Sequence, residues 1–420
     1  YQRNLEELLQ ICKDNGKYPS FSTDPEEVIS HGDFIFIAVG TPPQPNGEPN
    51  LEYLKSAAET IGKYMPDGAI VINKSTVPVG SGNWVAMLVE NGIALRETIA
   101  DEATTLTLPK INFSVASNPE FLREGSAIAD TLYPDRIVLG SDNNGVADKL
   151  KQLYKELSSQ SFKAPDFCLR PEGFGEVEVI STDVTSAEMI KYSANSFLAT
   201  KISFANQISN ICDLVGADVN EVMKGIGSDS RIGHRFLNAG IGWGGSCFGK
   251  DVDALIKIAG EYNYSPEILS AAKKVNYAQR DLVIKRLQEN LKIIKGKKIG
   301  LLGLAFKPNT DDLRDAPALD IAAALLKLGA RVVATDPIAI ENSKVQNPGF
   351  ELDYVDSPDE LAEGLDALIL VTEWKEYCDL DMAALLEKMN GNLFIDGRNQ
   401  YSPSKMREIG FNYVGMGRGA

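Results

Sequence analysis

Short apolar runs alternate with amphipathic segments along the first third of the chain. Three of these runs, at residues 33–40, 69–73 and 112–117, are mostly apolar from end to end, which is the pattern of parallel strands buried on both faces. Each run is followed by a loop that contains polar residues, glycine or proline. Open α/β sheets bind their ligands at the carboxyl ends of the strands, so a site is expected first in these three loops.

One long helix is predicted over residues 185–215. Thr185 and Glu188 have the spacing of a capping box, and Gly216 is placed to end the helix. The apolar residues that fall on roughly one face of it are Phe197, Phe204, Ile208, Ile211 and Val215. This is more apolar surface than one small domain needs, so we expect the helix to pack between domains or subunits. A shorter amphipathic helix is predicted at residues 4–12.

The α/β pattern starts again in the last third of the chain. A strand at residues 298–306 enters a turn that contains glycine, and a helix at 318–328 leads to a second strand at 331–335. Further apolar runs at 367–371 and 393–395 continue the sheet. The turn lacks the full G-x-G-x-x-G pattern, so the dinucleotide signal at this point is weak.

These patterns predict an α/β fold with two Rossmann-like parallel-sheet domains joined by a long central helix. The chain has 420 residues, enough for two or three domains of ordinary size. The predicted boundaries are 1–182 for the first α/β domain, 183–292 for the central helical region, and 293–420 for the second α/β domain.

Composition and charge narrow the class of partner. Hydrophobic residues make up 44% and charged residues 24%, as in ordinary globular proteins. The net charge of −16 argues against nucleic acid or an anionic membrane surface as the main partner. The five cysteines are far apart and show no C-x-x-C spacing, so neither a disulfide framework nor a metal site is predicted, and a reducing cytoplasm fits. No apolar run is long enough to span a bilayer.

A glycine-dense segment at residues 240–251 carries the strongest candidate for chemistry. Cys247 follows four glycines, and Lys250 and Asp251 come three and four residues later. Glycines let a backbone approach a ligand closely, and a nearby cation favours the thiolate, the reactive form of a cysteine. Taken alone, the segment is equally consistent with an inert buried cysteine beside a surface Lys–Asp pair.

Lys191 and Asn195 form a second candidate pair near the start of the long helix. They lie four residues apart and therefore share a helix face. By itself, such a pair is more often a solvated surface feature. Arg398 follows the apolar run at 393–395, which places a cation at the carboxyl end of a strand.

Longer motifs follow one another along nearly the whole chain. They lie at residues 39–43 (VGTPP), 74–80 (KSTVPVG), 117–125 (SNPEFLREG), 134–138 (PDRIV), 186–195, 229–233 (DSRIG), 240–251, 303–314 and 395–398 (IDGR). In this order they resemble the motifs of the UDP-glucose 6-dehydrogenases, within the wider group of nucleotide-sugar dehydrogenases. Any one match could arise by chance, but together they are highly specific.

The resemblance implies a four-electron oxidation. The C6 alcohol of UDP-glucose becomes a carboxylate, with two NAD per turnover, through a thiohemiacetal and a thioester on a cysteine. The implied catalytic residues are Cys247 as nucleophile, Lys191 and Asn195 as donors to the oxyanion, Glu120 as a base acting through a water, and Thr76 and Asp251, which help to place that water.

The same resemblance assigns the binding residues and the domains. The implied substrate contacts are Glu120, Phe121, Leu122, Arg123, Glu124, Lys191, Asn195, Arg231, Phe236, Gly244, Lys307 and Arg398. The implied cofactor contacts are Val39, Thr41, Thr76, Glu124, Lys250 and Arg314. Arginine and lysine suit the UDP diphosphate. The first domain would then bind NAD and the last one UDP, and Arg231 would reach the site of a neighbouring subunit in a homodimer or larger assembly.

The chain also departs from the family pattern. Family members open with a strand, a Gly-x-Gly-Tyr-Val-Gly loop and a helix that hold the pyrophosphate of NAD, whereas no such segment precedes Tyr1. We therefore expect that residues upstream are missing and that the chain as given binds NAD weakly. Smaller departures are Trp243, Gly249 and extra residues around 100–109 and 162–177.

Two alternatives stay open at this point. The chain could act on GDP-mannose or a UDP-N-acetylhexosamine, although the motifs at 121–125 and 134–138 are closer to the UDP-glucose branch. It could instead be a non-catalytic protein that binds a UDP-sugar. A binding protein would have no need for the thiol of Cys247, which favours an enzyme.

Overall fold

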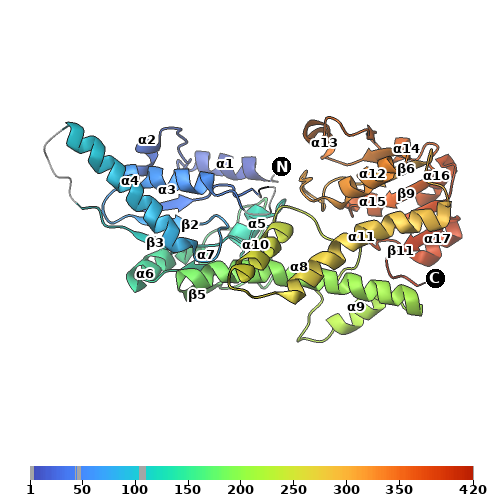
Figure 1. The fold of residues 1–420 in the computed structure, drawn as a ribbon, viewed down its shortest axis with the longest axis horizontal. Coiled ribbons are helices and arrows are strands. Elements are labelled where there is room, and N and C mark those ends of the chain that lie inside the picture. Colours follow the sequence, from blue (N-terminus) through green and yellow to red (C-terminus); the bar gives the residue numbers. More distant parts are fainter. Residues whose placement is uncertain (1–3, 43, 45–48, 104–109, 420) are drawn as a thin grey trace. The chain divides into compact units, whose positions relative to one another are not determined.

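A computed structural model describes residues 4–42, 44, 49–103 and 110–419 (Figure 1). Tyr1, Pro43 and most of the expected insertion at 100–109 therefore lie outside the described residues. The chain divides into two compact units. We call Gln2–Ala194 with Asp253–Tyr262 the N-terminal unit, and Asn195–Val252 with Asn263–Ala420 the C-terminal unit. None of the helices in the described ranges is both long and apolar enough to cross a membrane.

The N-terminal unit is built on a five-stranded sheet with the strand order β1-β2-β3-β4-β5. Its strands are β1 (Phe34–Ile37), β2 (Ile70–Asn73), β3 (Ser114–Ser117), β4 (Arg136–Gly140) and β5 (Glu178–Thr182). Its helices are α1 (Leu5–Asp14), α2 (Pro25–Ile29), α3 (Glu52–Tyr64), α4 (Ser81–Ala103), α5 (Ala127–Leu132), α6 (Asn144–Leu153) and α7 (Lys155–Ser158). The three strands and the first helix predicted from the sequence are confirmed. Neighbouring strands are parallel except β3 and β4, which meet in an antiparallel bridge.

The strand β2 is buried on both faces of this sheet. Val71 packs into one apolar cluster with α3 and α4, whereas Ile70 and Ile72 pack into another with α6. Side chains alternate between the two faces of a strand, and both faces of this one meet helices. This explains why β2 is a continuous apolar run in the sequence.

The helices α3 and α4 pack side by side on one face of the sheet (Figure 1). Two glycines let their backbones approach. A Cβ atom on Gly62 would lie 2.0 Å from the carbonyl oxygen of Val89, and one on Gly92 would lie 2.0 Å from that of Glu59. No side chain fits at these distances, so the spacing of the two helices depends on both glycines.

Gly92→Ala should destabilise the protein although alanine is the better helix former. The new methyl group would collide with backbone that cannot turn aside, and we expect the free energy of unfolding to fall by about 2–3 kcal/mol. Gly225→Ala is the matched control, because Gly225 lies in a helix with open space around its missing Cβ. In Gly225→Ala the free energy of unfolding should rise by up to about 1 kcal/mol. Equal changes in the two variants, measured by urea denaturation, would contradict the packing argument.

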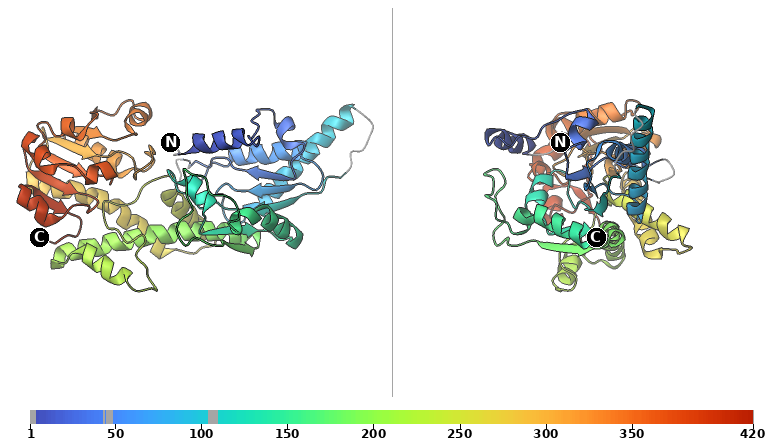
Figure 2. Two further views of the ribbon diagram at one scale, coloured as in Figure 1. Left: turned by 180° about the vertical axis from the view of Figure 1, so that it is seen from behind. Right: turned by 90° about the vertical axis from the view of Figure 1, so that its left-hand side faces the viewer.

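The C-terminal unit contains a six-stranded parallel sheet with the strand order β11-β10-β9-β6-β7-β8. Its strands are β6 (Lys298–Leu302), β7 (Arg331–Thr335), β8 (Asp353–Tyr354), β9 (Ala367–Leu370), β10 (Leu393–Asp396) and β11 (Asn412–Gly415). Its helices include α9 (Val219–Gly227), α11 (Glu267–Leu291), α12 (Pro317–Lys327), α13 (Ile340–Gln346), α14 (Pro358–Leu361), α15 (Lys375–Cys378), α16 (Met382–Lys388) and α17 (Pro403–Ile409). Helices cover both faces of the sheet (Figure 2). The chain moves outward from β6 in one direction and from β9 in the other, and right-handed crossovers in opposite directions place their helices on opposite faces. The strands and helix predicted for the last third of the chain are confirmed.

The helix α8 (Val184–Val215) confirms the predicted long helix, and Gly216 ends it with a φ of 76°. The helix α10 (Phe248–Glu261) begins directly after Cys247. Both helices have residues in each unit. The sheets and the crossover helices confirm the predicted fold class, while the three predicted domain boundaries stay a prediction.

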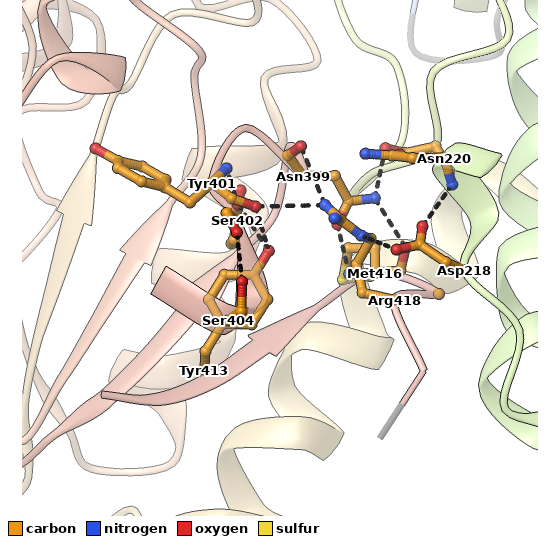
Figure 3. Close-up of polar contacts among 12 residues, drawn as sticks. Asp218, Asn220, Asn399, Tyr401, Ser402, Ser404, Tyr413, Met416 and Arg418 are labelled. Carbon is orange, nitrogen blue, oxygen red and sulfur yellow. Dashed lines mark hydrogen bonds and ion pairs between the residues drawn. The ribbon is translucent and has the colours of Figure 1, made fainter. Parts of the chain in front are cut away.

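The C-terminal segment is bonded to the start of α9 (Figure 3). The guanidinium of Arg418 donates to Asp218 at 3.0 Å, and Asp218 also accepts the backbone N–H of Asn220 in the first turn of α9. The side chain of Asn399 bonds both the N–H and the carbonyl oxygen of Met416 at 2.8 Å. The segment after β11 is therefore an integral part of the C-terminal unit.

Candidate active site

The loops after β1 and β2 bring together three residues that were assigned to the cofactor. The two strands pair in parallel up to Ile37 and Asn73, so their loops start side by side. The hydroxyl of Thr41 donates to the carbonyl oxygen of Thr76 at 2.9 Å, and the hydroxyl of Ser75 donates to that of Val39 at 2.7 Å. Val39, Thr41 and Thr76 thus lie in one bonded pair of loops.

This pair of loops fits a nucleotide. It lies at the carboxyl ends of parallel strands, where Rossmann-like sheets bind nucleotides. Gly40 is exposed, with open space where its side chain would be. A ligand can therefore come close to the backbone at this point.

Glu188 holds the end of the second loop, at the start of α4. Its Oε2 accepts the N–H of Gly80 at 2.6 Å, and the carboxyl group is buried. Burial raises the pKa of Glu188 to about 7, although the N–H groups of Gly80, Ser81 and Gly82 oppose the rise. The predicted capping box is wrong, because Asp183 caps α8 instead by accepting the N–H of Ser186 at 2.7 Å.

The raised pKa of Glu188 predicts that the folded state loses stability as the pH rises. The folded protein keeps its proton up to a pKa of about 7, whereas the unfolded chain releases it near 4.5. Between these two pH values the folded state binds more protons than the unfolded chain. The stability that Glu188 contributes in this way is therefore fully present below pH 4.5 and is lost as the pH rises through 7. The difference in pKa corresponds to about 3 kcal/mol.

The test compares the wild-type protein with Glu188→Gln by urea denaturation at pH 5 and pH 8. Relative to the variant, the wild type should lose about 2.5 kcal/mol between the two pH values, slightly less than the full difference because the unfolded carboxyl is already largely ionised at pH 5. The comparison across pH cancels any fixed cost of the amide. Parallel pH curves for the two proteins would show that Glu188 does not titrate in this range.

Lys191 and Glu120 meet at the carboxyl end of β3. The ammonium of Lys191 donates to the carboxylate Oε1 of Glu120 at 3.0 Å and to its carbonyl oxygen at 2.6 Å. Lys191 is only 4% exposed. The other carboxylate oxygen of Glu120 accepts the N–H of Leu122 at 2.7 Å, and the ring of Phe121 lies 5.4 Å from the Lys191 nitrogen. A desolvated cation and an oriented carboxylate are thus held together in the N-terminal unit.

Cys247 lies at the start of α10, where its carbonyl oxygen accepts the N–H of Asp251 at 2.9 Å. The first N–H groups of a helix are free of helical partners and carry partial positive charge. The hydroxyl oxygen of Ser246 lies 3.5 Å from the sulfur. Cys247 therefore stands at a helix N-terminus with a polar neighbour beside its sulfur.

Asp251 is fully buried one helical turn after Cys247. Its two carboxylate oxygens accept from Asn195 at 2.6 Å and from Lys250 at 2.8 Å. These bonds offset the cost of burying the charge. The structure thus brings Asn195, Lys250 and Asp251 together around the first turn of α10.

Side chains of distant residues bond the backbone of the glycine loop before Cys247 and hold it in place. The N–H and carbonyl oxygen of Trp243 both bond the side chain of Asn276, at 2.7 and 3.0 Å, and Arg280 also donates to that oxygen. A Cβ on Gly244 would lie 2.2 Å from the carbonyl oxygen of Asp315. Only glycine therefore fits at 244, and the loop lies directly against the segment that follows β6.

Other residues predicted to bind substrate or cofactor lie close to the same loop in the C-terminal unit. Arg398 donates to the carbonyl oxygen of Gly242 at 3.1 Å, and the carbonyl oxygen of Arg314 accepts the N–H of Gly245 at 2.9 Å. Lys307 lies over the ring of Phe306, which in turn lies against Gly245. Phe236 has a positive φ of 64° and meets Phe248 edge-on.

All four predicted arginines are paired with carboxylates, and Arg123 and Arg231 are the most exposed of them. Arg123 pairs with Asp130, and Arg231 pairs with Asp229 with 87% of its side chain exposed. Exposed ion pairs of this kind contribute little stability, so an anionic ligand can compete for either arginine. Glu124 follows Arg123 in the same loop after β3.

Sequence reasoning missed several residues that organise these groups. Asn118, Asn276 and Arg280 carry no role in the sequence-based assignment, and Glu188 was assigned only as a cap of α8, yet each bonds a loop that holds assigned residues. Lys74 was missed as well, although it directly follows a predicted strand in a loop expected to hold a ligand.

Family models match most of the chain. Residues 1–158 match the NAD binding domain of the UDP-glucose/GDP-mannose dehydrogenase family, residues 185–278 its central domain and residues 300–403 its UDP binding domain. The chain belongs to this family. It is therefore an NAD-dependent dehydrogenase, and the loops after β1 and β2 lie within the matched NAD binding domain.

Individual relatives match over the full chain. A UDP-glucose 6-dehydrogenase of Bacillus subtilis is 41% identical over 420 residues, which are all of this chain and 88% of the relative. One of Pseudomonas aeruginosa is 40% identical, over all of this chain and 87% of the relative. The solved UDP-glucose dehydrogenase of Pyrobaculum islandicum superposes with a TM-score of 0.83 at 36% identity, covering all of this chain and 87% of that one.

Proposed function

We propose that this dehydrogenase oxidises UDP-glucose to UDP-glucuronate in two successive steps. The observation that carries the proposal is the position of Cys247 at the start of α10, next to the desolvated group of Asp251, Asn195 and Lys250. A thiol at this place is what the second oxidation requires. Full-length relatives that are about 40% identical and are named UDP-glucose 6-dehydrogenases support the choice of substrate.

In the first step the C6 alcohol becomes an aldehyde, with its hydroxyl proton passing to Glu120 through a water. When bound, NAD would supply the hydride acceptor for each oxidation. Lys191 and Asn195, four residues apart on α8, would donate hydrogen bonds to the C6 oxygen as it gains negative charge. In the N-terminal unit, the bonds from Lys191 and Leu122 keep the Glu120 carboxylate oriented.

In the second step the Cys247 thiolate adds to the aldehyde carbon and forms a C–S bond. The carbonyl oxygen takes the negative charge in the resulting thiohemiacetal, which would become a thioester by loss of a hydride to bound NAD. Glu120 then takes one proton from a water, placed with the help of Thr76 and Asp251, and the water oxygen attacks the thioester carbon. The C–S bond breaks, the second proton of the water leaves to solvent, and the carboxylate and the thiolate are released.

A panel of nucleotide sugars tests the substrate. UDP-glucose, GDP-mannose and UDP-N-acetylglucosamine would each be offered with NAD, and kcat/KM would be measured from NADH formation. We expect UDP-glucose to be preferred by at least roughly 10²-fold, because a site that bonds a specific hydroxyl rejects analogues strongly. A higher kcat/KM for either of the other sugars would overturn the assignment of the substrate.

We further propose that the chain forms a homodimer through α8. Phe197, Phe204 and Ile211 lie seven residues apart and are exposed, as are Leu214 and Val215 at the end of the helix. An apolar stripe of this size on a described surface is unusual for a monomer, and residues spaced by seven keep to one helix face. A second copy of the same helix is the simplest partner that matches the stripe.

Phe204→Glu tests the dimer. A charge in the middle of the stripe should dissociate the assembly, because a buried unpaired carboxylate is costly, and the mass measured by light scattering should fall to that of one chain. Val345→Glu is the control, since Val345 is an exposed apolar residue on α13 in the same unit. A Phe204→Glu protein with the same mass as the control would contradict an interface at this stripe.

A further inference from the structure

Lys74 is joined to the candidate site through a buried amide. It follows β2, and its ammonium donates to the side-chain oxygen of Asn118 at 3.1 Å. Asn118 is 2% exposed; its amide nitrogen donates to the carbonyl oxygen of Val138 at 2.9 Å, and its oxygen also accepts the hydroxyl of Tyr154. Every partner of this side chain comes from a different part of the N-terminal unit, so its orientation is fixed.

Asn118 lies two residues before Glu120 in the loop after β3. Pro119 lies between them and restricts the backbone. Glu120 is in turn bonded by Lys191 through both its carboxylate and its carbonyl oxygen. Lys74, Asn118, Glu120 and Lys191 therefore form one connected path across the ends of β2, β3 and α8.

Electrostatic interactions also connect Lys74 with Glu120 and Lys191. Burial lowers the pKa of Lys74, and the positive charge of Lys191 lowers it further, while the carboxylate of Glu120 opposes both. Arg136 adds another cation, with its guanidinium 3.8 Å from the centre of the Phe121 ring. In a protein with a net charge of −16, two lysines thus act on this carboxylate, and an arginine lies over the ring of the next residue.

A purely structural role does not account for Lys74. Its ammonium donates to a neutral amide, and holding a charge in a half-buried position without an ion pair costs free energy. An apolar or amide side chain would fill the same space with less cost. What a lysine adds here is positive charge close to Glu120 and Lys191.

We propose that Lys74 is a positioning residue for the oxidation. Through Asn118 it fixes the turn that carries Glu120, and its charge keeps the Glu120–Lys191 pair in the arrangement that the reaction uses. This inference rests on the proposed function for the roles of Glu120 and Lys191.

The test compares Lys74→Met, which removes the charge and keeps the length, with Lys74→Arg, which keeps the charge. In Lys74→Met, kcat should fall roughly 10- to 100-fold, since a small misplacement of a reacting group has effects of this size. The pH profile of kcat should also move upward by roughly 1 unit, because removing a nearby positive charge favours the protonated form of neighbouring groups. Lys74→Arg should keep the wild-type pH profile. Lys55→Met, on the exposed surface of α3, is the control and should change neither.

A second measurement needs no substrate. Protein labelled with ¹³C at lysine Cε would be titrated by NMR, with the Lys74 signal assigned from a Lys74→Arg sample. In Lys191→Met this signal should titrate at higher pH than in the wild type, because the charge of Lys191 lowers the pKa of Lys74, and in Lys55→Met it should not move. The shift would support the role of Lys74 even if UDP-glucose proved to be the wrong substrate, so the two proposals fail separately.

Three results would overturn the inference. An unchanged pH profile of kcat in Lys74→Met, together with an unchanged titration of Lys74 in Lys191→Met, would show that the charge of Lys74 does not act on the pair. Equal losses of kcat in Lys74→Met and Lys74→Arg with wild-type pH profiles would show a role in packing alone. A Lys74→Met protein that fails to fold, together with a Lys74→Arg protein whose pH profile is shifted, would also exclude positioning by charge.

Discussion

Cys247→Ser should abolish the formation of UDP-glucuronate while UDP-glucose still binds. The serine hydroxyl is a far weaker nucleophile than a thiolate, and an oxygen ester would be formed and released less readily than a thioester. We expect the rate of acid formation to fall by roughly 10³-fold or more. Acid would be measured by mass spectrometry, and binding of UDP-glucose by calorimetry.

Cys378→Ser is the matched control for this experiment. Cys378 is also a partly buried free cysteine, but it lies in α15, remote in sequence from the glycine loop. Its replacement should leave acid formation unchanged. Wild-type turnover in Cys247→Ser would rule out the covalent route, whatever the control showed.

Lys191→Met should lower kcat by roughly 10²–10³-fold. This is the usual effect of losing one donor to a developing oxyanion. The variant also removes the cation that holds both the carboxylate and the carbonyl oxygen of Glu120. Because the donor acts mainly on the transition state, KM for UDP-glucose should change much less than kcat.

The control for Lys191→Met is Lys151→Met, an exposed lysine of α6 in the same unit. It removes a charge of the same sign and should leave kcat and KM unchanged. A rise in KM with an unchanged kcat in Lys191→Met would mean that Lys191 binds the substrate and does not stabilise the oxyanion.

Much of the fold could be predicted because the sheets are buried on both faces. β2 is a continuous apolar run in the sequence since Val71 and Ile72 face two different helix layers. The end of α8 was predictable for a local reason as well, since Gly216 adopts a positive φ that most residues avoid. The antiparallel bridge between β3 and β4 had no comparable signal, because strand direction depends on the path of the intervening chain.

The chemistry of single groups was less predictable because their partners are distant in sequence. Glu188 looked like a local cap for α8, but its carboxyl group is buried against Gly80, more than a hundred residues earlier. Asp251 was expected to help place a water, and its burial between Asn195 and Lys250 emerged only from the fold. The family motifs located these side chains, while long-range contacts determine their burial and hydrogen bonds.

The most direct test of the account is the stoichiometry of NADH. UDP-glucose and excess NAD would be incubated with the 420-residue chain, NADH measured by absorbance and the product identified by mass. The account predicts two NADH for each UDP-glucuronate formed, with no free aldehyde accumulating. One NADH per product, with the aldehyde as the final product, or no NADH from UDP-glucose that is demonstrably bound, would contradict it.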